Sequence, residues 1–122
     1  MADGLRIPLR SQNVVLTANG SGIASGSITG VVGDIIGVGI TLGASMTTLA
    51  LTVTADVGDV VINGVTVTAN KVIPVRRPAV TNDGSTAITS SSIPYMNAGG
   101  AITAAIASAT TTKTVTITVY YR

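Results

Sequence analysis

The sequence predicts a single all-β domain, a β-sandwich or jelly roll with an extended N-terminal arm, and three observations support this fold class. Thr, Val and Ile make up 48 of the 122 residues, and side chains that branch at Cβ pack well on a pleated sheet. Several segments alternate apolar and polar residues with the period of two that strands require. Turn-forming residues separate these segments at short intervals, as in sandwiches and jelly rolls. We therefore assign residues 1–13 to the arm and residues 14–122 to the sandwich.

We expect about eight to ten short strands, each bounded by Gly, Asn, Ser or Pro. In the third expected strand, Ile35–Leu42, the side chains of Ile36, Val38 and Ile40 should share one face with Leu42. The opposite face of Gly and Thr should bend the strand or let another backbone approach closely. Ala101–Ala107 also fits a short helix, but the flanking Gly and Thr favour a strand. The expected strands are Asn13–Ala18, Ser27–Val32, Ile35–Leu42, Thr47–Ala55, Lys71–Thr81 with breaks at its two prolines, one around Ala87 and Ile88, Ala101–Ala107 and Lys113–Arg122.

Two local features are predicted in more detail. Val60–Val67 should form a β-hairpin, because Asn63 and Gly64 tolerate the positive φ angles that a type I′ turn needs at both central positions. In the last strand, alternation places Tyr121 on the inward face and Tyr120 on the outward face.

The N-terminal arm alternates three apolar residues with two arginines and a proline. In an extended chain, the apolar side chains would face one side and the cations the other. We expect the arm to lie on a partner surface and to become ordered on docking; a frayed terminus is the alternative. The alternating residues are Leu5, Arg6, Ile7, Pro8, Leu9 and Arg10.

The residue types that are missing exclude much catalytic chemistry. The chain has no His, Cys, Trp, Phe or Glu, so the usual general base, thiol nucleophile and transition-metal ligands are absent. No phosphate-binding loop or nucleophile–base pair is visible. Seven Lys and Arg against five Asp form no basic stripe of the kind that binds nucleic acid. We expect no enzymatic activity, no cofactor, no small-molecule substrate and no nucleic-acid partner.

The positive mean hydropathy of +0.59 requires a test for membrane insertion. The charge-free run Ile35–Ala55 is long enough to span a bilayer. It contains five Thr and three Gly, however, and its second half alternates with period two. The N-terminus also shows no basic region followed by an apolar segment. We therefore expect neither a membrane span nor a secretory signal.

Few charged side chains stand out as candidate sites. Asp56 and Asp59 could offer oxygen ligands to Ca²⁺, but with no third carboxylate nearby we interpret them as turn formers. Arg76 and Arg77, held between two prolines, could present guanidinium groups to a partner; charges solvated in a loop are the alternative.

The exterior of the domain is expected to carry few charges. Only 10% of the residues are charged, whereas soluble domains average about 25%. The run Gly84–Thr112 carries no charge at all. Thr, Ser and Gly must therefore cover much of the surface, which is typical of a subunit buried in a larger assembly. A secreted module is the alternative.

The order of features from Ile35 to Arg122 resembles the small capsid decoration proteins of tailed bacteriophages, also called head cement proteins. A Thr-rich alternating strand is followed by an expected hairpin, and a Thr-Val-Thr-Ile-Thr-Val-Tyr strand closes the chain. Between them lie four short motifs, Val75-Arg76-Arg77-Pro78, Thr81-Asn82-Asp83-Gly84, Ile93-Pro94-Tyr95 and Gly99-Gly100 with Ile102.

This resemblance implies a β-sandwich or jelly-roll protein without enzymatic activity, located on the outer surface of the virion. Many copies, as dimers or trimers, would bridge neighbouring subunits of the major capsid protein and hold the expanded shell against the pressure of packaged DNA. Tyr is enriched at interface hot spots, so tyrosines join the arm and loop residues in the expected partner interface. That interface comprises Arg6, Ile7, Arg10, Arg76, Arg77, Tyr95 and Tyr120.

Two other functions remain open. The chain could be a neck, tail or fibre module of a virion, although a fibre module favours a repeating sequence and none is visible. It could also be a glycan-binding β-domain, which should retain a glycan and Ca²⁺ near Asp56 and Asp59. Only three tyrosines are available for stacking on sugar rings.

Overall fold

The computed structural model describes residues 8–80 and 87–122, with the side chains of 78–80 and 87–92 left out of the description. The described residues form eleven strands and no helix, so the prediction of an all-β domain is confirmed. The strands are β1 (Arg10–Thr17), β2 (Ala24–Ile28), β3 (Val32–Leu42), β4 (Leu49–Thr54), β5 (Val60–Val67), β6 (Lys71–Pro74), β7 (Arg77–Val80), β8 (Ala87–Ile93), β9 (Tyr95–Ala98), β10 (Ile102–Ala107) and β11 (Thr114–Tyr121).

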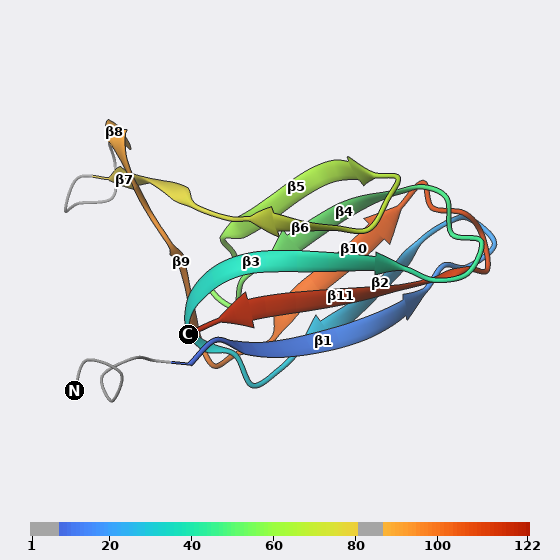
Figure 1. The fold of residues 1–122 in the computed structure, drawn as a ribbon, viewed down its shortest axis with the longest axis horizontal. Coiled ribbons are helices and arrows are strands. Elements are labelled where there is room, and N and C mark those ends of the chain that lie inside the picture. The colour runs from blue at the N-terminus through green and yellow to red at the C-terminus, as the bar shows by residue number, and fades with distance from the viewer. Residues whose placement is uncertain (1–7, 81–86) are drawn as a thin grey trace.

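Two antiparallel sheets pack together as a jelly roll (Figure 1). Sheet A has the order β1-β11-β3-β6, and sheet B has the order β2-β10-β4-β5. With β7, β8 and β9 set aside, eight strands remain. They pair from the two ends of the sequence inward: β1 with β11, β2 with β10, β3 with β6 and β4 with β5. This nested pairing is the jelly-roll arrangement, in which the chain behaves as one long hairpin rolled into two layers.

The segment between β6 and β10 forms an insertion at one end of the sandwich. β6 pairs with the second part of β3, from Gly37 to Ile40, and β9 pairs with its first part, from Val32 to Ile35. Between them the chain leaves sheet A as the β7–β8 hairpin, which projects from the sandwich (Figure 1). The chain then returns as β9 to the same edge of β3.

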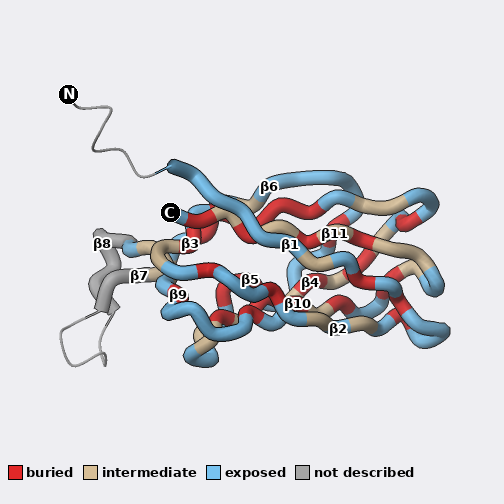
Figure 2. Tube along the Cα trace, turned by 90° about the horizontal axis from the view of Figure 1, so that it is seen from below, coloured by how far each residue is buried: buried red, intermediate tan, exposed pale blue. Residues whose placement is uncertain are grey.

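The core lies between the two sheets, as the buried residues in Figure 2 show. β11 buries Val115, Ile117 and Val119 and leaves the intervening threonines half-buried. Burying one such side chain contributes about 1.5–3 kcal/mol. Tyr121 is also buried, and its hydroxyl donates to the carbonyl oxygen of Gly30 over 3.1 Å. The predicted inward and outward faces of the last strand are therefore confirmed.

The predicted face of the third strand is wrong at Ile36. The pairing of β3 with β11 shifts between two partners, because Tyr120 faces Gly37 whereas Tyr121 faces Ile35. Ile36 is the extra residue of this irregularity. It is 38% exposed, while Ile35 is 1% exposed and takes the core position. An inserted residue reverses the alternation locally, because side chains change face at every step.

The predicted hairpin in Val60–Val67 is also wrong. β5 is a single strand that pairs with β4, with two residues, Asn63 and Gly64, opposite the single Thr52. Gly64 has φ of +62° and donates its N–H to the Thr52 hydroxyl over 3.1 Å. Asn63 has no positive φ, so the type I′ geometry does not form. The pair makes a bulge instead of a turn, because β4 continues to pair on both sides of it.

The other predicted strands differ from the structure mainly in their bounds. Ser27–Val32 is misplaced: β2 ends at Ile28 and β3 begins at Val32, because Gly30 with φ of +81° makes a turn between them. β1 begins at Arg10, three residues before the predicted start. Ala101–Ala107 is a strand, as predicted, and forms β10.

Candidate partner-binding cleft

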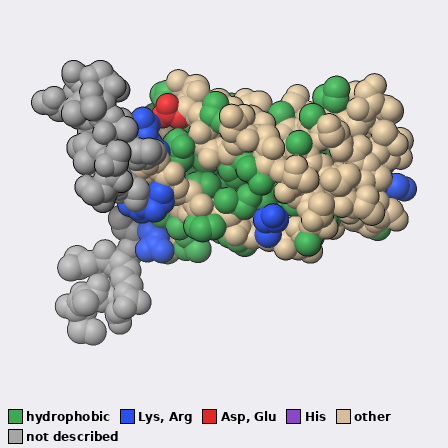
Figure 3. Space-filling view, turned by 90° about the horizontal axis from the view of Figure 1, so that it is seen from above, with side chains coloured by type: hydrophobic (Ala, Val, Ile, Leu, Met, Phe, Trp, Pro, Cys, Tyr) green, Lys and Arg blue, Asp and Glu red, His purple; other side chains and the backbone are tan. Residues whose placement is uncertain are grey.

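Charged side chains gather at one end of the sandwich, which we call the hairpin end because β7 and β8 project from it. Arg122 joins this end to β3, since it exchanges two backbone hydrogen bonds with Asp34, of 2.9 and 3.1 Å. Figure 3 shows most of the visible Lys and Arg side chains near this end. In the described part of the chain, only Lys71 and Lys113 are charged elsewhere. The charged residues of the hairpin end are Arg10, Asp34, Asp56, Asp59, Arg76, Arg77 and Arg122.

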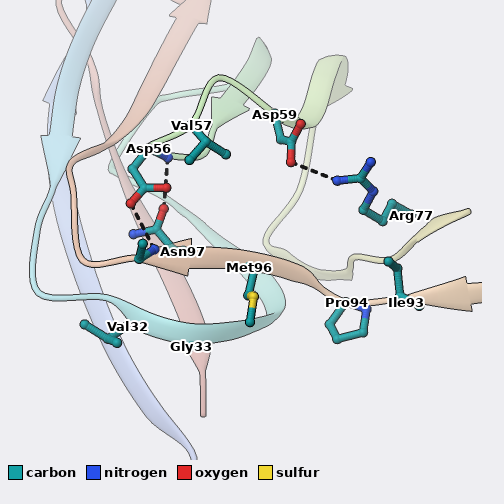
Figure 4. A pocket seen from close by; sticks show the side chains of 11 residues that line it. Val32, Gly33, Asp56, Val57, Asp59, Arg77, Ile93, Pro94, Met96 and Asn97 are labelled. Atoms are coloured by element: carbon teal, nitrogen blue, oxygen red, sulfur yellow. Dashed lines mark hydrogen bonds and ion pairs between the residues drawn. The ribbon is translucent and has the colours of Figure 1, made fainter. Parts of the chain in front are cut away.

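A cleft of about 670 Å³ opens at the hairpin end between β3, β9, the β4–β5 turn and the base of the hairpin (Figure 4). Large apolar side chains line it and are exposed to solvent: Val32 is 64% exposed, Val57 71%, Met96 66% and Ile93 40%. The volume lies within the range of about 300–1,000 Å³ that is usual for binding clefts. Exposed apolar groups gathered in one concave site indicate a surface that binds a partner.

Asn97 holds one wall of the cleft in place. Its side chain is buried, and its amide donates to the carbonyl oxygens of Val31 and Gly100 over 2.9 and 3.0 Å. Its Oδ1 accepts the backbone N–H of Asp56 over 2.9 Å. One amide therefore connects the start of β3, the β4–β5 turn and the β9–β10 turn, which are far apart in the sequence.

Asp56 makes the reciprocal connection. Its Oδ2 accepts the backbone N–H groups of Ala98 and Gly100 over 2.9 and 3.0 Å, while its Oδ1 is buried without a hydrogen-bond partner. The backbone of the same turn closes with Ala55 N–H donating to the Asp59 carbonyl oxygen over 2.8 Å. The Asp56 carboxylate is thus used to join two turns. Among the described residues, no group of three or more His, Cys, Asp or Glu side chains is placed to hold a metal ion.

Arg77 closes the cleft on the hairpin side. Its Nη1 lies 2.9 Å from Asp59 Oδ2, and its guanidinium carbon lies 5.8 Å from the centre of the Tyr95 ring. The side chains of Arg77 and Asp59 are 32% and 40% exposed, so the ion pair contributes less than about 1 kcal/mol. Its main effect is positional, because it connects the base of the hairpin to the β4–β5 turn.

The structure brings together only part of the predicted interface. Arg77 lines the cleft and its guanidinium lies over the Tyr95 ring, whereas neither Tyr95 nor the exposed Arg76 lines the cleft. Arg10 begins β1 opposite Tyr121, and Tyr120 lies on the outer face of sheet A. Arg6 and Ile7, with most of the predicted arm, lie outside the described residues.

Sequence reasoning missed the apolar lining of the cleft. Val57 stands in the turn Asp56-Val-Gly-Asp59, where a β-branched apolar residue has no core position to fill. That mismatch of residue type and local structure is a signal that could have identified it. Met96 gives no such signal, because its exposure follows from how β9 pairs with β3.

The cleft can hold an apolar segment, with paired charges at its rim. No helix in the described part of the chain is long and apolar enough to cross a membrane. Comparison of the sequence with protein-family models and with curated proteins finds no match.

Proposed function

We propose that the chain is a structural virion protein that binds the outside of a tailed-phage capsid and stabilises the expanded shell. It would do so by bridging neighbouring subunits of the major capsid protein. The observation that carries the proposal is the cleft at the hairpin end, where Val32, Val57 and Met96 are more than half exposed in a chain with few charges. The resemblance of Ile35–Arg122 to decoration proteins supports the same function.

The cleft has the composition of a binding interface. Such interfaces combine an apolar centre with a polar rim, and here the apolar floor is bordered by the Asp59–Arg77 ion pair. Covering Val57 or Met96 with a partner would contribute about 1–2 kcal/mol each. Each contact would be weak, but a subunit that bridges two capsid proteins gains avidity from the second contact.

The fold is compatible with this function without identifying it. Jelly rolls occur in viral capsid proteins and also in lectins, and a fold can carry many functions. A glycan-binding site would need an aromatic ring free to stack on a sugar. No aromatic residue lines the described cleft, and the nearby Tyr95 ring has the Arg77 guanidinium over it, which makes glycan binding there the weaker alternative.

The proposal is tested by sedimenting expanded empty shells, assembled from the major capsid protein encoded in the same genome, with the purified chain. We expect the chain to co-sediment in many copies and to raise the temperature at which the shells break. The double variant Val57→Asp with Met96→Asp should lose at least about tenfold in affinity. Ile23→Asp, at the opposite end of the sandwich and 52% exposed in the native chain, is the matched control and should bind normally.

Two outcomes would overturn the proposal. The first is the absence of co-sedimentation at any protein concentration. The second is equal binding by the cleft variant and the control, since the cleft would then not be the contact surface.

A further inference from the structure

The outer face of sheet A carries no charged side chain in the part formed by β1, β11, β6 and the segment of β3 from Gly37 to Leu42. The register of the four strands identifies its residues, because side chains that share a face lie on paired positions. They are Ser11, Asn13, Val15 and Thr17 of β1, Thr114, Thr116, Thr118 and Tyr120 of β11, Gly37, Gly39 and Thr41 of β3, and Val72 and Pro74 of β6. Sheet A lies in front of sheet B in Figure 1, so this face is turned toward the viewer.

Two glycines of β3 leave this face without projecting side chains, so that neighbouring groups approach the strand closely. A Cβ atom at Gly39 would lie 2.9 Å from Cε2 of Tyr120, so the tyrosine ring lies down over the strand at this position. A Cβ atom at Gly37 would lie 3.2 Å from the carbonyl oxygen of Ile73. The predicted Gly-rich face of the third strand thus admits a neighbouring ring and a backbone carbonyl. A flat surface results, onto which another flat surface can pack.

Apolar side chains are exposed on both sides of the flat region. Val15 on β1 is 61% exposed and Val72 on β6 is 62% exposed. Near β6 the surface dips into an apolar hollow of about 280 Å³, bounded by Leu9, Ile36 and Tyr120 together with Val72. The outer face of sheet B also lacks charges, but its outward positions on β2, β10 and β4 are Ser, Thr and Ala, and an exposed valine, Val60, occurs only on the edge strand β5. Sheet A differs in having exposed apolar side chains on both of its edge strands.

We infer that a second copy of this chain packs its own sheet A against this face. A face without charges offers nothing for a charged partner to recognise, whereas it is complementary to itself. A two-fold axis running along the strands places β1 of each copy over β6 of the other, which covers Val15 and Val72 in both copies. Isologous pairing of this kind is the commonest arrangement of homo-oligomers.

The size of the face is consistent with a weak dimer. β1 and β11 have eight residues each and β6 has four, and β3 contributes the segment from Gly37 to Leu42; with strands about 4.8 Å apart and about 3.4 Å per residue, the face covers roughly 420 Å². Two copies would together bury about 850 Å², which is below the size of stable interfaces and in the range of weak, transient ones. The dimer should therefore form only at high protein concentration. This inference concerns the chain alone and does not depend on binding to a capsid.

The test is sedimentation equilibrium of the full chain over a wide concentration range. We expect a monomer–dimer equilibrium for the native chain. Val15→Arg places two unpaired cations in the dimer and should raise the dissociation constant at least about tenfold. Adding Val72→Asp to the same chain should restore part of the affinity, because the partner's arginine then lies near an opposite charge only two residues away along the strand direction.

Ser25→Arg is the matched control, since it adds the same charge on β2 of the other sheet at an exposed position. It should leave the dimer unchanged, and circular dichroism should show every variant folded. The inference is overturned if the native chain stays monomeric at all concentrations or forms a closed trimer. It is also overturned if Val15→Arg and Ser25→Arg have equal effects, or if the Val72→Asp addition gives no recovery.

Discussion

Asn97 and Asp56 bind each other's turns in both directions. Asn97 Oδ1 accepts the backbone N–H of Asp56, in the β4–β5 turn, over 2.9 Å. Asp56 Oδ2 in return accepts the backbone N–H groups of Ala98 and Gly100, at the β9–β10 turn. Side-chain oxygens thus satisfy backbone donors of two turns, the β4–β5 turn within sheet B and the β9–β10 turn that leads from sheet A to sheet B. The arrangement fixes the wall of the cleft on which Val57 and Met96 stand.

Asn97→Ala should destabilise the fold by about 3 kcal/mol. The substitution removes three hydrogen bonds and leaves the buried carbonyl oxygen of Val31 without its donor, and each buried group left unpaired costs about 1–3 kcal/mol. Urea denaturation measures the loss. Asn63→Ala is the control, because Asn63 is exposed in the β5 bulge, and it should change stability by less than about 0.5 kcal/mol. Equal effects at the two positions would contradict this account of Asn97.

Gly33→Ala should be more destabilising than Gly58→Ala, although both glycines have a positive φ, of +118° and +92°. A Cβ at Gly33 would lie 2.6 Å from the carbonyl oxygen of Arg122, which two backbone bonds to Asp34 hold in place. Nothing lies within 4 Å of a Cβ at Gly58. We expect about 1 kcal/mol for the strained φ alone at Gly58, and about 3 kcal/mol at Gly33, where the backbone must also move.

Thermal unfolding of the two glycine variants measures this difference. Similar melting temperatures would show that the strand end at Arg122 yields easily. In that case the connection between β11 and the start of β3 would be looser than the hydrogen bonds indicate.

The Asp59–Arg77 ion pair should stabilise the fold only slightly. A double-mutant cycle of Asp59→Ala and Arg77→Ala should give a coupling below about 1 kcal/mol, which falls further in concentrated salt, because both side chains are about one-third exposed. A coupling of several kcal/mol that does not respond to salt would mean that the pair is shielded from solvent.

Arg76 and Arg77 should matter more for binding to the capsid than for folding. Arg76→Ala with Arg77→Ala should weaken attachment to expanded shells in the sedimentation assay while shifting the melting temperature by only a few degrees. Unchanged attachment would remove both residues from the proposed interface.

The sequence predicts this fold well where strand faces depend on local alternation. β10 and β11 follow period two throughout, so Ile106 and Ile117 fall on the core face as expected. Prediction from alternation fails where pairing with a neighbouring strand sets the register. Ile36 is displaced by the irregular pairing of β3 with β11, and Gly64 lies in a bulge because β4 continues beside it. Both effects come from neighbours distant in the sequence, which alternation does not reveal.

In the candidate site, too, some features could be predicted from the sequence, whereas others depend on residues that are distant in the sequence. Residue type and the flanking prolines selected Arg77, and residue type selected Tyr95; the Arg77 guanidinium does lie over the Tyr95 ring, but only Arg77 lines the cleft. Their companion Asp59 lies 18 residues from Arg77 and was expected only to form a turn. The role of Asn97 depends entirely on burial, since an Asn before Ala-Gly-Gly is typical of any turn. Its hydrogen bond to Val31, 66 residues away, is what makes it structural.

Tyr121→Phe should cost about 1 kcal/mol, and Tyr120→Phe should cost almost nothing. The two tyrosines are adjacent on β11 but face opposite sides of sheet A. The hydroxyl of Tyr121 donates to the carbonyl oxygen of Gly30 over 3.1 Å in a part-buried site, and losing such a bond costs about 0.5–1.5 kcal/mol while leaving the acceptor poorly solvated. The Tyr120 ring lies on the outer face over Gly39, where water can replace any contact of its hydroxyl. Urea denaturation of the two single variants tests this at a chain concentration low enough for the monomer to predominate, so that dimerisation through the outer face does not cover Tyr120. An equal or larger loss for Tyr120→Phe would contradict this account of the two hydroxyl groups.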